Sequence, residues 1–210
     1  MANSTLKLYY FNLQARAELI RLIFAAAGRP WNDVRFENKE WPQYKPKMIL
    51  GQCPVLELPD GTQIPQSLTI SRYVARENGL AGKDNLESAK IDAVADTQRD
   101  LNDVFHSKIL FEKDQKKKTE EIKRFTDGDL FKYVNRLMIL KKAYSRDTKY
   151  FVGSNLSWAD LYVYLSIERI IKSMPNMKSS LDAHFKPTLD MVNSNSNIRK
   201  YLNERPVTPF

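Results

Sequence analysis

Tyr10 and Arg16 are the first two residues whose types and spacing suit chemistry. Tyr10 lies near the end of a short β-prone run, residues 6–11, and Arg16 follows six positions later, at the start of an apolar helical pattern. A phenol beside a cation and a helix N-terminus can have a pKa below its usual value of about 10. Such a phenol would hold a substrate anion by a hydrogen bond. The alternative interpretation is that Tyr10 is a core aromatic residue between two others.

Two further polar pairs suit the binding of an anion. Gln66 and Ser67 open a predicted helix, where unpaired backbone N–H groups favour a carboxylate, although an ordinary serine cap gives the same pattern. Trp41 and Lys45 offer an indole donor and an ammonium group four residues apart. The stretch from Trp41 to Pro46 is rich in proline, so we predict no regular element there.

An acidic stripe stands out in this basic chain. Asp92, Asp96, Asp100 and Asp103 recur at helical spacing and therefore share one face of a helix. Like charges at this spacing repel one another, and the neighbouring Arg99 relieves only part of the repulsion. The stripe indicates a cationic partner, namely a ligand ammonium group, a basic subunit surface or a divalent cation. A solvated surface remains the alternative.

Several kinds of chemistry are excluded by composition. The seven glycines form neither GxGxxG nor GxxxxGK, which excludes the common phosphate-binding loops. The single cysteine, Cys53, forms no CxxC motif, and two histidines are too few for the usual structural zinc sites. Cys53 lies between Gln52 and Pro54 without a flanking stabiliser of a thiolate, so we expect it to be no nucleophile. We expect no bound metal.

The net charge of +8 is concentrated in residues 116–149, which alone carry +6. Three lysines at 116–118 precede Glu120 and Glu121, and no aromatic residues alternate with them. This pattern favours a solvated helix surface over a nucleic-acid site. The chain has no signal-peptide pattern at its start and no apolar run of membrane-spanning length. We therefore expect a cytoplasmic protein without nucleic-acid or membrane partners.

The order of predicted elements divides the chain into two domains. Strand signals at residues 6–11 and 34–36 flank a helix over residues 16–27, and a hairpin over residues 54–64 precedes a helix that begins at Gln66. This is a thioredoxin-like α/β order with a mixed sheet, which we assign to residues 1–80. Gly79 to Gly82 forms a linker, and residues 83–210 are predicted to be all-helical. Ser157 and Asp160 form a capping box for one of these helices.

Taken together, these segments resemble the glutathione S-transferase family, specifically class sigma. The resemblance spans nearly the whole chain. It is carried, in order, by Tyr10-Phe11-Asn12 with Arg16-Ala17-Glu18, by Glu40-Trp41-Pro42, by residues 66–73 and by Ser157-Trp158-Ala159-Asp160. The resemblance implies a glutathione-binding thioredoxin-like domain, an all-α second domain and a homodimer.

The same resemblance implies a reaction and its residues. Tyr10, supported by Arg16, would stabilise the glutathione thiolate, which attacks a hydrophobic electrophile. Asp100 would reach the glutathione of the partner subunit. The implied glutathione-binding residues are Tyr10, Arg16, Trp41, Lys45, Gln52, Cys53, Pro54, Gln66, Ser67 and Asp100. The implied electrophile pocket consists of Phe11, Leu13, Ala15, Ser107, Tyr162 and Phe210.

The sequence departs from the family pattern at several positions, and these departures bear on which alternative functions are favoured. Gln14-Ala15 stands where Arg-Gly is common, and Ser107 stands where the vertebrate prostaglandin D synthases of this class have tryptophan. Arg99 replaces one aspartate of their cation-binding cluster. The resemblance therefore implies a detoxifying transferase, with reduction of hydroperoxides as a further activity. The alternatives are a lens S-crystallin-like structural protein, disfavoured by the short stretch at residues 111–119, and a prostaglandin D isomerase, disfavoured by Ser107.

Overall fold

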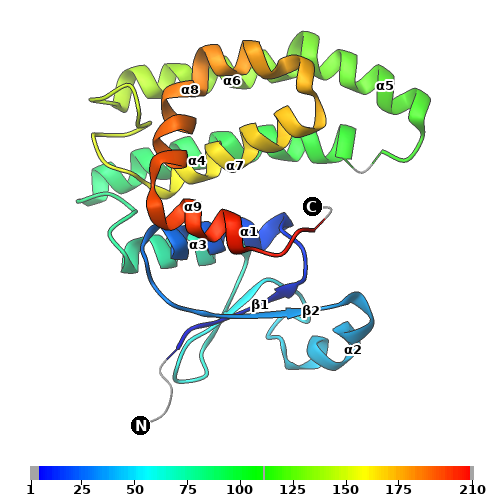
Figure 1. The fold of residues 1–210 in the computed structure, drawn as a ribbon, viewed down its shortest axis with the longest axis vertical. Coiled ribbons are helices and arrows are strands. Elements are labelled where there is room, and N and C mark those ends of the chain that lie inside the picture. The colour runs from blue at the N-terminus through cyan, green and yellow to red at the C-terminus, as the bar shows by residue number, and fades with distance from the viewer. Residues whose placement is uncertain (1–4, 111, 209–210) are drawn as a thin grey trace. The chain divides into compact units, whose positions relative to one another are not determined.

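The computed structural model describes residues 5–110 and 112–208 of the chain. The chain divides into two compact units (Figure 1). The first consists of the chain up to Leu80 together with the chain from Asn193 onward, and the second is Ala81–Val192. The C-terminal segment therefore belongs to the same unit as the N-terminal sheet. Each unit is described below by itself.

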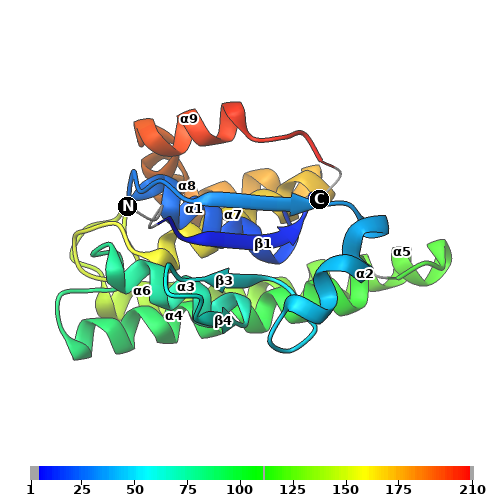
Figure 2. The same cartoon turned by 90° about the horizontal axis from the view of Figure 1, so that it is seen from below.

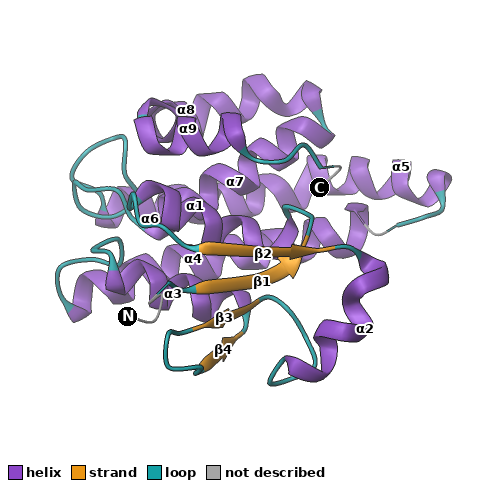
Figure 3. Ribbon diagram, turned by 60° about the horizontal axis from the view of Figure 1, so that its bottom comes forward, coloured by secondary structure: helices purple, strands orange, loops and turns teal. Residues whose placement is uncertain are grey.

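A four-stranded mixed sheet forms the centre of the first unit (Figure 3). Its strands are β1 (Lys7–Phe11), β2 (Asn32–Phe36), β3 (Val55–Glu57) and β4 (Gln63–Pro65), in the spatial order β2-β1-β3-β4. β1 is parallel to β2 and antiparallel to β3, and β4 is antiparallel to β3. Along β1 buried and half-buried side chains alternate, as the period of a strand requires. The predicted hairpin and mixed sheet are confirmed.

Three longer helices complete the first unit: α1 (Glu18–Ala26), α3 (Ser67–Glu77) and α9 (Ser196–Glu204). α1 packs against both α3 and α9, and it is buried nearly all round because its side chains are mostly aliphatic. A 3₁₀ turn, Ala15–Ala17, precedes α1. The turn between β1 and α1 is therefore followed directly by a helix that is almost fully buried.

The prediction that Trp41 to Pro46 lacks regular structure is wrong. The short helix α2 (Trp41–Tyr44) and a 3₁₀ turn, Lys45–Lys47, follow β2 (Figure 2). Pro42 and Pro46 stand in the first two positions of these turns. Proline is compatible with those positions because no intrahelical N–H donor is needed there.

The second unit is helical among its described residues. It comprises α4 (Asn85–Phe105), α5 (Gln115–Arg124), α6 (Leu130–Tyr144), α7 (Trp158–Ser173) and most of α8 (Lys178–Ser194), and α4 packs against α6 and α7. Both halves of the capping box form at the start of α7, between Ser157 and Asp160. The chain is thus an α/β domain with a small mixed sheet followed by a helical domain, as predicted.

Part of the basic stretch forms an exposed helical surface, whereas Lys141 within it is buried and donates to Thr188 at 2.9 Å. α5 contains no buried residue, and Arg124 pairs with Glu121 at 2.9 Å. Lys116 and Lys117 are exposed. Among the helices of the described residues, none has both the length and the apolar composition needed to cross a membrane.

Candidate active site

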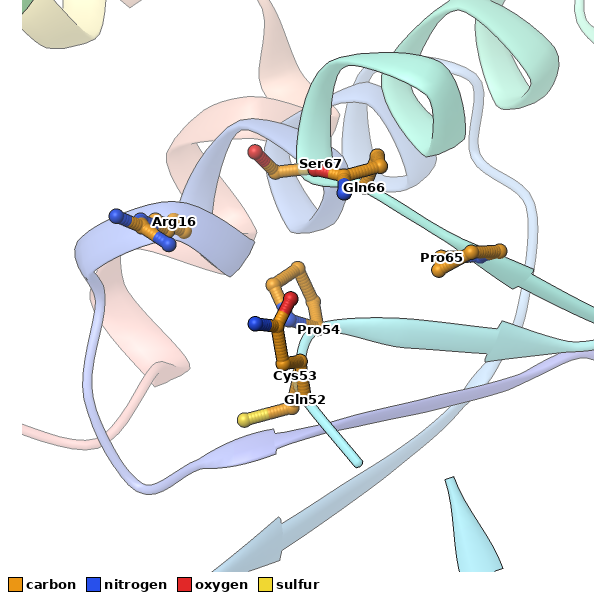
Figure 4. Close-up of a pocket in the computed structure, with 7 residues that line it drawn as sticks. All are labelled: Arg16, Gln52, Cys53, Pro54, Pro65, Gln66 and Ser67. Atoms are coloured by element: carbon orange, nitrogen blue, oxygen red, sulfur yellow. The ribbon is translucent and has the colours of Figure 1, made fainter. Parts of the chain in front are cut away.

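A polar pocket lies in the first unit, at the ends of β3, β4 and the turn before α1. Arg16, Pro54 and Ser67 line it from three separate segments of the chain (Figure 4). The lining consists of Arg16, Gln52, Cys53, Pro54, Pro65, Gln66 and Ser67. Six of these seven residues are among those that the family resemblance implies. Pro65, at the end of β4, was not anticipated.

Cys53 contributes a neutral thiol to this pocket. Burial raises its pKa to about 11, and the backbone of Phe11 and the charge of Arg16 oppose this rise only in part. A thiol with this pKa carries almost no thiolate near neutral pH. The Cys53–Pro54 peptide bond is cis. The high pKa makes the Cys53 sulfur a poor nucleophile near neutral pH.

Gln66 and Ser67 lie at the N-terminus of α3. Gln66 has φ = 73°, a conformation that costs energy for a residue other than glycine. Ser67 is the first residue of α3, and no side-chain hydrogen bond caps the helix. The interpretation of Ser67 as an ordinary serine cap is therefore wrong. The first N–H groups of α3 have no capping side chain, which suits a carboxylate ligand.

Tyr10 is 6% exposed, and its phenolic oxygen accepts a hydrogen bond from the backbone N–H of Arg16 at 3.4 Å. The expected lowering of its pKa is wrong. Burial raises the pKa of Tyr10, and this effect exceeds the lowering by the Arg16 N–H and by the charges of Arg16 and Arg21. The phenol therefore stays protonated near neutral pH. A protonated phenol can donate its hydrogen to a sulfur anion, whereas a phenolate cannot.

Trp41 and Lys45 come from the α2 segment and lie outside the pocket lining itself. The Trp41 ring stacks on Phe36, with centroids 5.6 Å apart and an interplanar angle of 14°. The Lys45 side chain lies close to Gly51. A Cβ atom placed on Gly51 would be 3.6 Å from the Lys45 Cε. Gly51 directly precedes Gln52 of the pocket. Lys45 thus lies next to the loop that enters the pocket, whereas Trp41 is anchored at the end of β2.

The residues implied for the electrophile pocket fall into two groups. Phe11 is the last residue of β1, Leu13 and Ala15 lie between β1 and α1, and Ala15 has φ = 33°. Ser107 and Tyr162 belong to the second unit. There, the Ser107 hydroxyl donates to the Asp103 carbonyl at 2.7 Å, and Tyr162 lies in α7. Phe210 lies outside the described residues.

The acidic stripe lies on α4, in the second unit. Arg99 contacts Asp96 at 3.7 Å and Asp100 at 3.8 Å. Part of the cationic partner predicted for the stripe is thus supplied by its own helix. Asp100 is nevertheless exposed, with 52% of its side chain accessible, so it can contact a further group.

Two buried charges next to the site were missed in the sequence. Glu18 and Arg21 are 1% and 0% exposed, and the Arg21 Nη1 lies 3.5 Å from Glu18 Oε2. Their signal is an acidic and a basic residue three positions apart in a helix that is otherwise apolar. Such a pair must be satisfied internally, because burial of an unpaired charge is costly.

The fold agrees with comparisons to known proteins. Residues 4–76 match the glutathione S-transferase N-terminal domain, and residues 100–205 match its C-terminal domain. A glutathione S-transferase from Anopheles gambiae is 32% identical over 96% of this chain and 97% of its own. S-crystallin 3 of Enteroctopus dofleini is 33% identical over 97% and 98%. The chain belongs to the glutathione S-transferase family.

Two further similarities refine this assignment. The hematopoietic prostaglandin D synthase of Gallus gallus is 42% identical over 74% of each chain. The structure of a sigma class glutathione S-transferase from Fasciola hepatica superposes with a TM-score of 0.87, at 25% identity, covering 98% of this chain and 99% of that one. The relatives thus include glutathione S-transferases, an S-crystallin and a prostaglandin D synthase.

Proposed function

We propose that this protein is a sigma-class glutathione transferase that conjugates reduced glutathione to hydrophobic electrophiles. The observation that carries the proposal is the position of Tyr10. Its protonated hydroxyl is fixed by the Arg16 N–H, next to a pocket whose lining matches the implied glutathione site. Glutathione is the co-substrate, and the reaction needs no metal.

In the proposed reaction the Tyr10 hydroxyl donates a hydrogen bond to the glutathione sulfur and favours its thiolate form. A hydrogen bond to an ion contributes about 1.5–3 kcal/mol. The thiolate attacks the electrophilic carbon, a carbon–sulfur bond forms, and the leaving group departs with the electron pair of the bond that breaks. Arg16 supports the negative charge from the pocket wall.

Other pocket residues, together with Trp41 and Lys45 beside the pocket, position the tripeptide. Ser67 and the N-terminus of α3 bind the γ-glutamyl carboxylate together with Gln66, and the backbone of Cys53 pairs with the cysteinyl amide. Trp41 and Lys45 hold the glycine carboxylate, and Gln52 lies between these two ends. We further propose that the protein is a cytoplasmic homodimer in which Asp100 reaches the partner's glutathione.

The initial rate with glutathione and 1-chloro-2,4-dinitrobenzene tests the proposal. We expect clear turnover by the wild type and a decrease of about 10- to 100-fold in kcat/KM for Tyr10→Phe. Equal rates for the two proteins would contradict the mechanism. Tight glutathione binding without turnover would favour the S-crystallin-like alternative, in line with the 33% identity to an octopus S-crystallin.

The similarity to a prostaglandin D synthase supports a second candidate activity, isomerisation of prostaglandin H2. Ser107 disfavours it, because its small hydroxyl is bonded to the helix backbone and offers no ring for stacking. Product analysis with prostaglandin H2 and glutathione distinguishes the two activities. A prostaglandin D2 product at a rate comparable with conjugation would favour the isomerase.

A further inference from the structure

The segment that joins Tyr10, in β1, to Arg16 is built around one buried guanidinium group. Arg21, on α1, is 0% exposed. Its Nη1 donates to the Leu13 carbonyl at 2.5 Å, and its Nη2 lies 3.5 Å from the Phe11 carbonyl. Both acceptors come shortly after Tyr10 in the chain: Phe11 ends β1, and Leu13 lies in the turn before α1. The guanidinium therefore pins this segment to α1 at two points.

The same guanidinium contacts Tyr10 itself. The Arg21 Cζ lies 5.9 Å from the centroid of the Tyr10 ring. Phe11 packs against the Tyr10 ring in an edge geometry, with centroids 5.7 Å apart. Arg21 thus contributes both to the position of the ring and to the backbone that follows it.

Two carboxylates fix the orientation of Arg21. Its Nε donates to Asp33 at 3.1 Å, and its Nη1 lies 3.5 Å from Glu18. Asp33 is also bonded to Arg35 at 2.7 Å, and Arg35 donates to the Asn12 side chain at 3.3 Å. The fork geometry of a guanidinium allows these contacts at the same time, which a lysine ammonium group cannot reproduce.

The C-terminal segment completes the arrangement through Glu18. Tyr201 on α9 donates to Glu18 Oε1 at 3.0 Å, and Arg205 donates to the same oxygen at 2.5 Å. One oxygen of Glu18 is thus held by the C-terminal segment and the other faces Arg21. Tyr201 and Arg205 are therefore linked, through Glu18 and Arg21, to the turn that follows β1.

We propose that Arg21 is a positioning residue for the transferase reaction and that the C-terminal segment, through Arg205 and Glu18, holds Arg21 in place. The inference deepens the proposed function and rests on it for its catalytic consequence. Arg21 touches no substrate in this account. It acts through Tyr10, whose phenol is also faced by Arg16 and Cys53.

Two readouts test the proposal on Arg21→Gln and Arg21→Lys. The first is hydrogen exchange of the peptide covering residues 11–17 in the absence of glutathione, which does not depend on activity. We expect faster exchange of this peptide in both variants, because neither side chain can bond Leu13, Phe11 and the two carboxylates together. Unchanged exchange in a folded Arg21→Gln protein would overturn the proposal.

The second readout is the pH profile of kcat/KM for conjugation. We expect a loss of about 10-fold or more at neutral pH, and recovery of most of it above the pKa of the free thiol, where the thiolate forms without help. The dissociation constant of glutathione should change by less than about threefold. An equal loss at every pH would show a merely structural role and overturn the proposal.

A second pair of variants keeps the test decisive if Arg21→Gln does not fold. Arg205→Gln removes a side chain that is 24% exposed, and Arg199→Gln, on the exposed side of α9, is its matched control. We expect a smaller change in the same direction for Arg205→Gln and none for Arg199→Gln. No difference between them would contradict the role of the C-terminal segment. A wild type without any conjugation refutes the proposed function, whereas the exchange of residues 11–17 still decides the role of Arg21.

Discussion

The phenolic oxygen of Tyr10 accepts the backbone N–H of Arg16 at 3.4 Å. Because this oxygen is an acceptor towards the backbone, its own hydrogen is available to a ligand in the adjoining pocket. Burial keeps the phenol protonated by raising its pKa. A buried neutral donor is what stabilisation of a thiolate requires, since a phenolate would repel the sulfur anion.

Ser67→Ala should weaken glutathione binding without changing the stability of the protein. Ser67 lines the pocket and makes no capping hydrogen bond to α3. Loss of one hydrogen bond to a carboxylate corresponds to about a 10- to 100-fold rise in the dissociation constant. Thr69→Ala, an exposed position on the same helix, is the control. Equal affinity of the two variants, measured by calorimetry, would remove Ser67 from the site.

Ala15→Gly should stabilise the protein. Ala15 has φ = 33°, which costs a non-glycine residue about 1–2 kcal/mol. Glycine avoids this strain but loses more chain entropy on folding, so we expect a net gain of about 0.5–1 kcal/mol in the free energy of urea unfolding. Ala26→Gly in α1 should instead lose about the same amount. A loss in both variants would show that Ala15 is not strained.

Asp160→Ala should be far more damaging than removal of an exposed cap. Asp160 is fully buried and accepts hydrogen bonds from the backbone N–H groups of Phe151 and Ser157. Their loss leaves buried donors unpaired, and we expect a cost of about 3 kcal/mol. Asp84→Ala, at the exposed N-cap of α4, should cost about 1 kcal/mol. Similar unfolding free energies for the two variants would contradict this reasoning.

The same carboxyl makes stability depend on pH. Burial raises the pKa of Asp160 from 3.8 to about 6, so the folded protein binds a proton there that the unfolded chain has released. Its contribution is fully present below pH 3.8 and is lost as pH rises through 6. Relative to Asp160→Asn, the wild type should therefore lose about 2 kcal/mol between pH 4 and pH 6. A constant difference across this interval would contradict the raised pKa.

The sequence predicts most of the sheet and its connecting helices because the signals are local. Alternation along residues 6–11 and the Pro59-Asp60-Gly61 turn suffice for β1 and the hairpin. The helical turns at residues 41–47 are not predicted, because proline marks the start of a helix as well as its interruption.

The sequence predicts the site less well where a property of a side chain depends on its burial. The identities of the pocket residues follow from family resemblance, but the pKa direction of Tyr10 does not, because local sequence shows the nearby cation and not the surrounding core. Arg21 and Glu18 were missed for the same reason. Tyr201 and Arg205, which bond Glu18, are more than 180 positions away from it in the chain. No periodicity in the sequence connects these residues.

The most direct test of the central claim is the ionisation of glutathione bound to the protein, followed by thiolate absorbance as pH is raised. We expect the bound thiol to titrate between about pH 6.5 and 7.5 in the wild type and close to the free value of about 8.5 in Tyr10→Phe. Tyr9→Phe, whose hydroxyl faces Glu57 instead, should titrate like the wild type. The same thiol pKa in the wild type and in Tyr10→Phe would contradict the account.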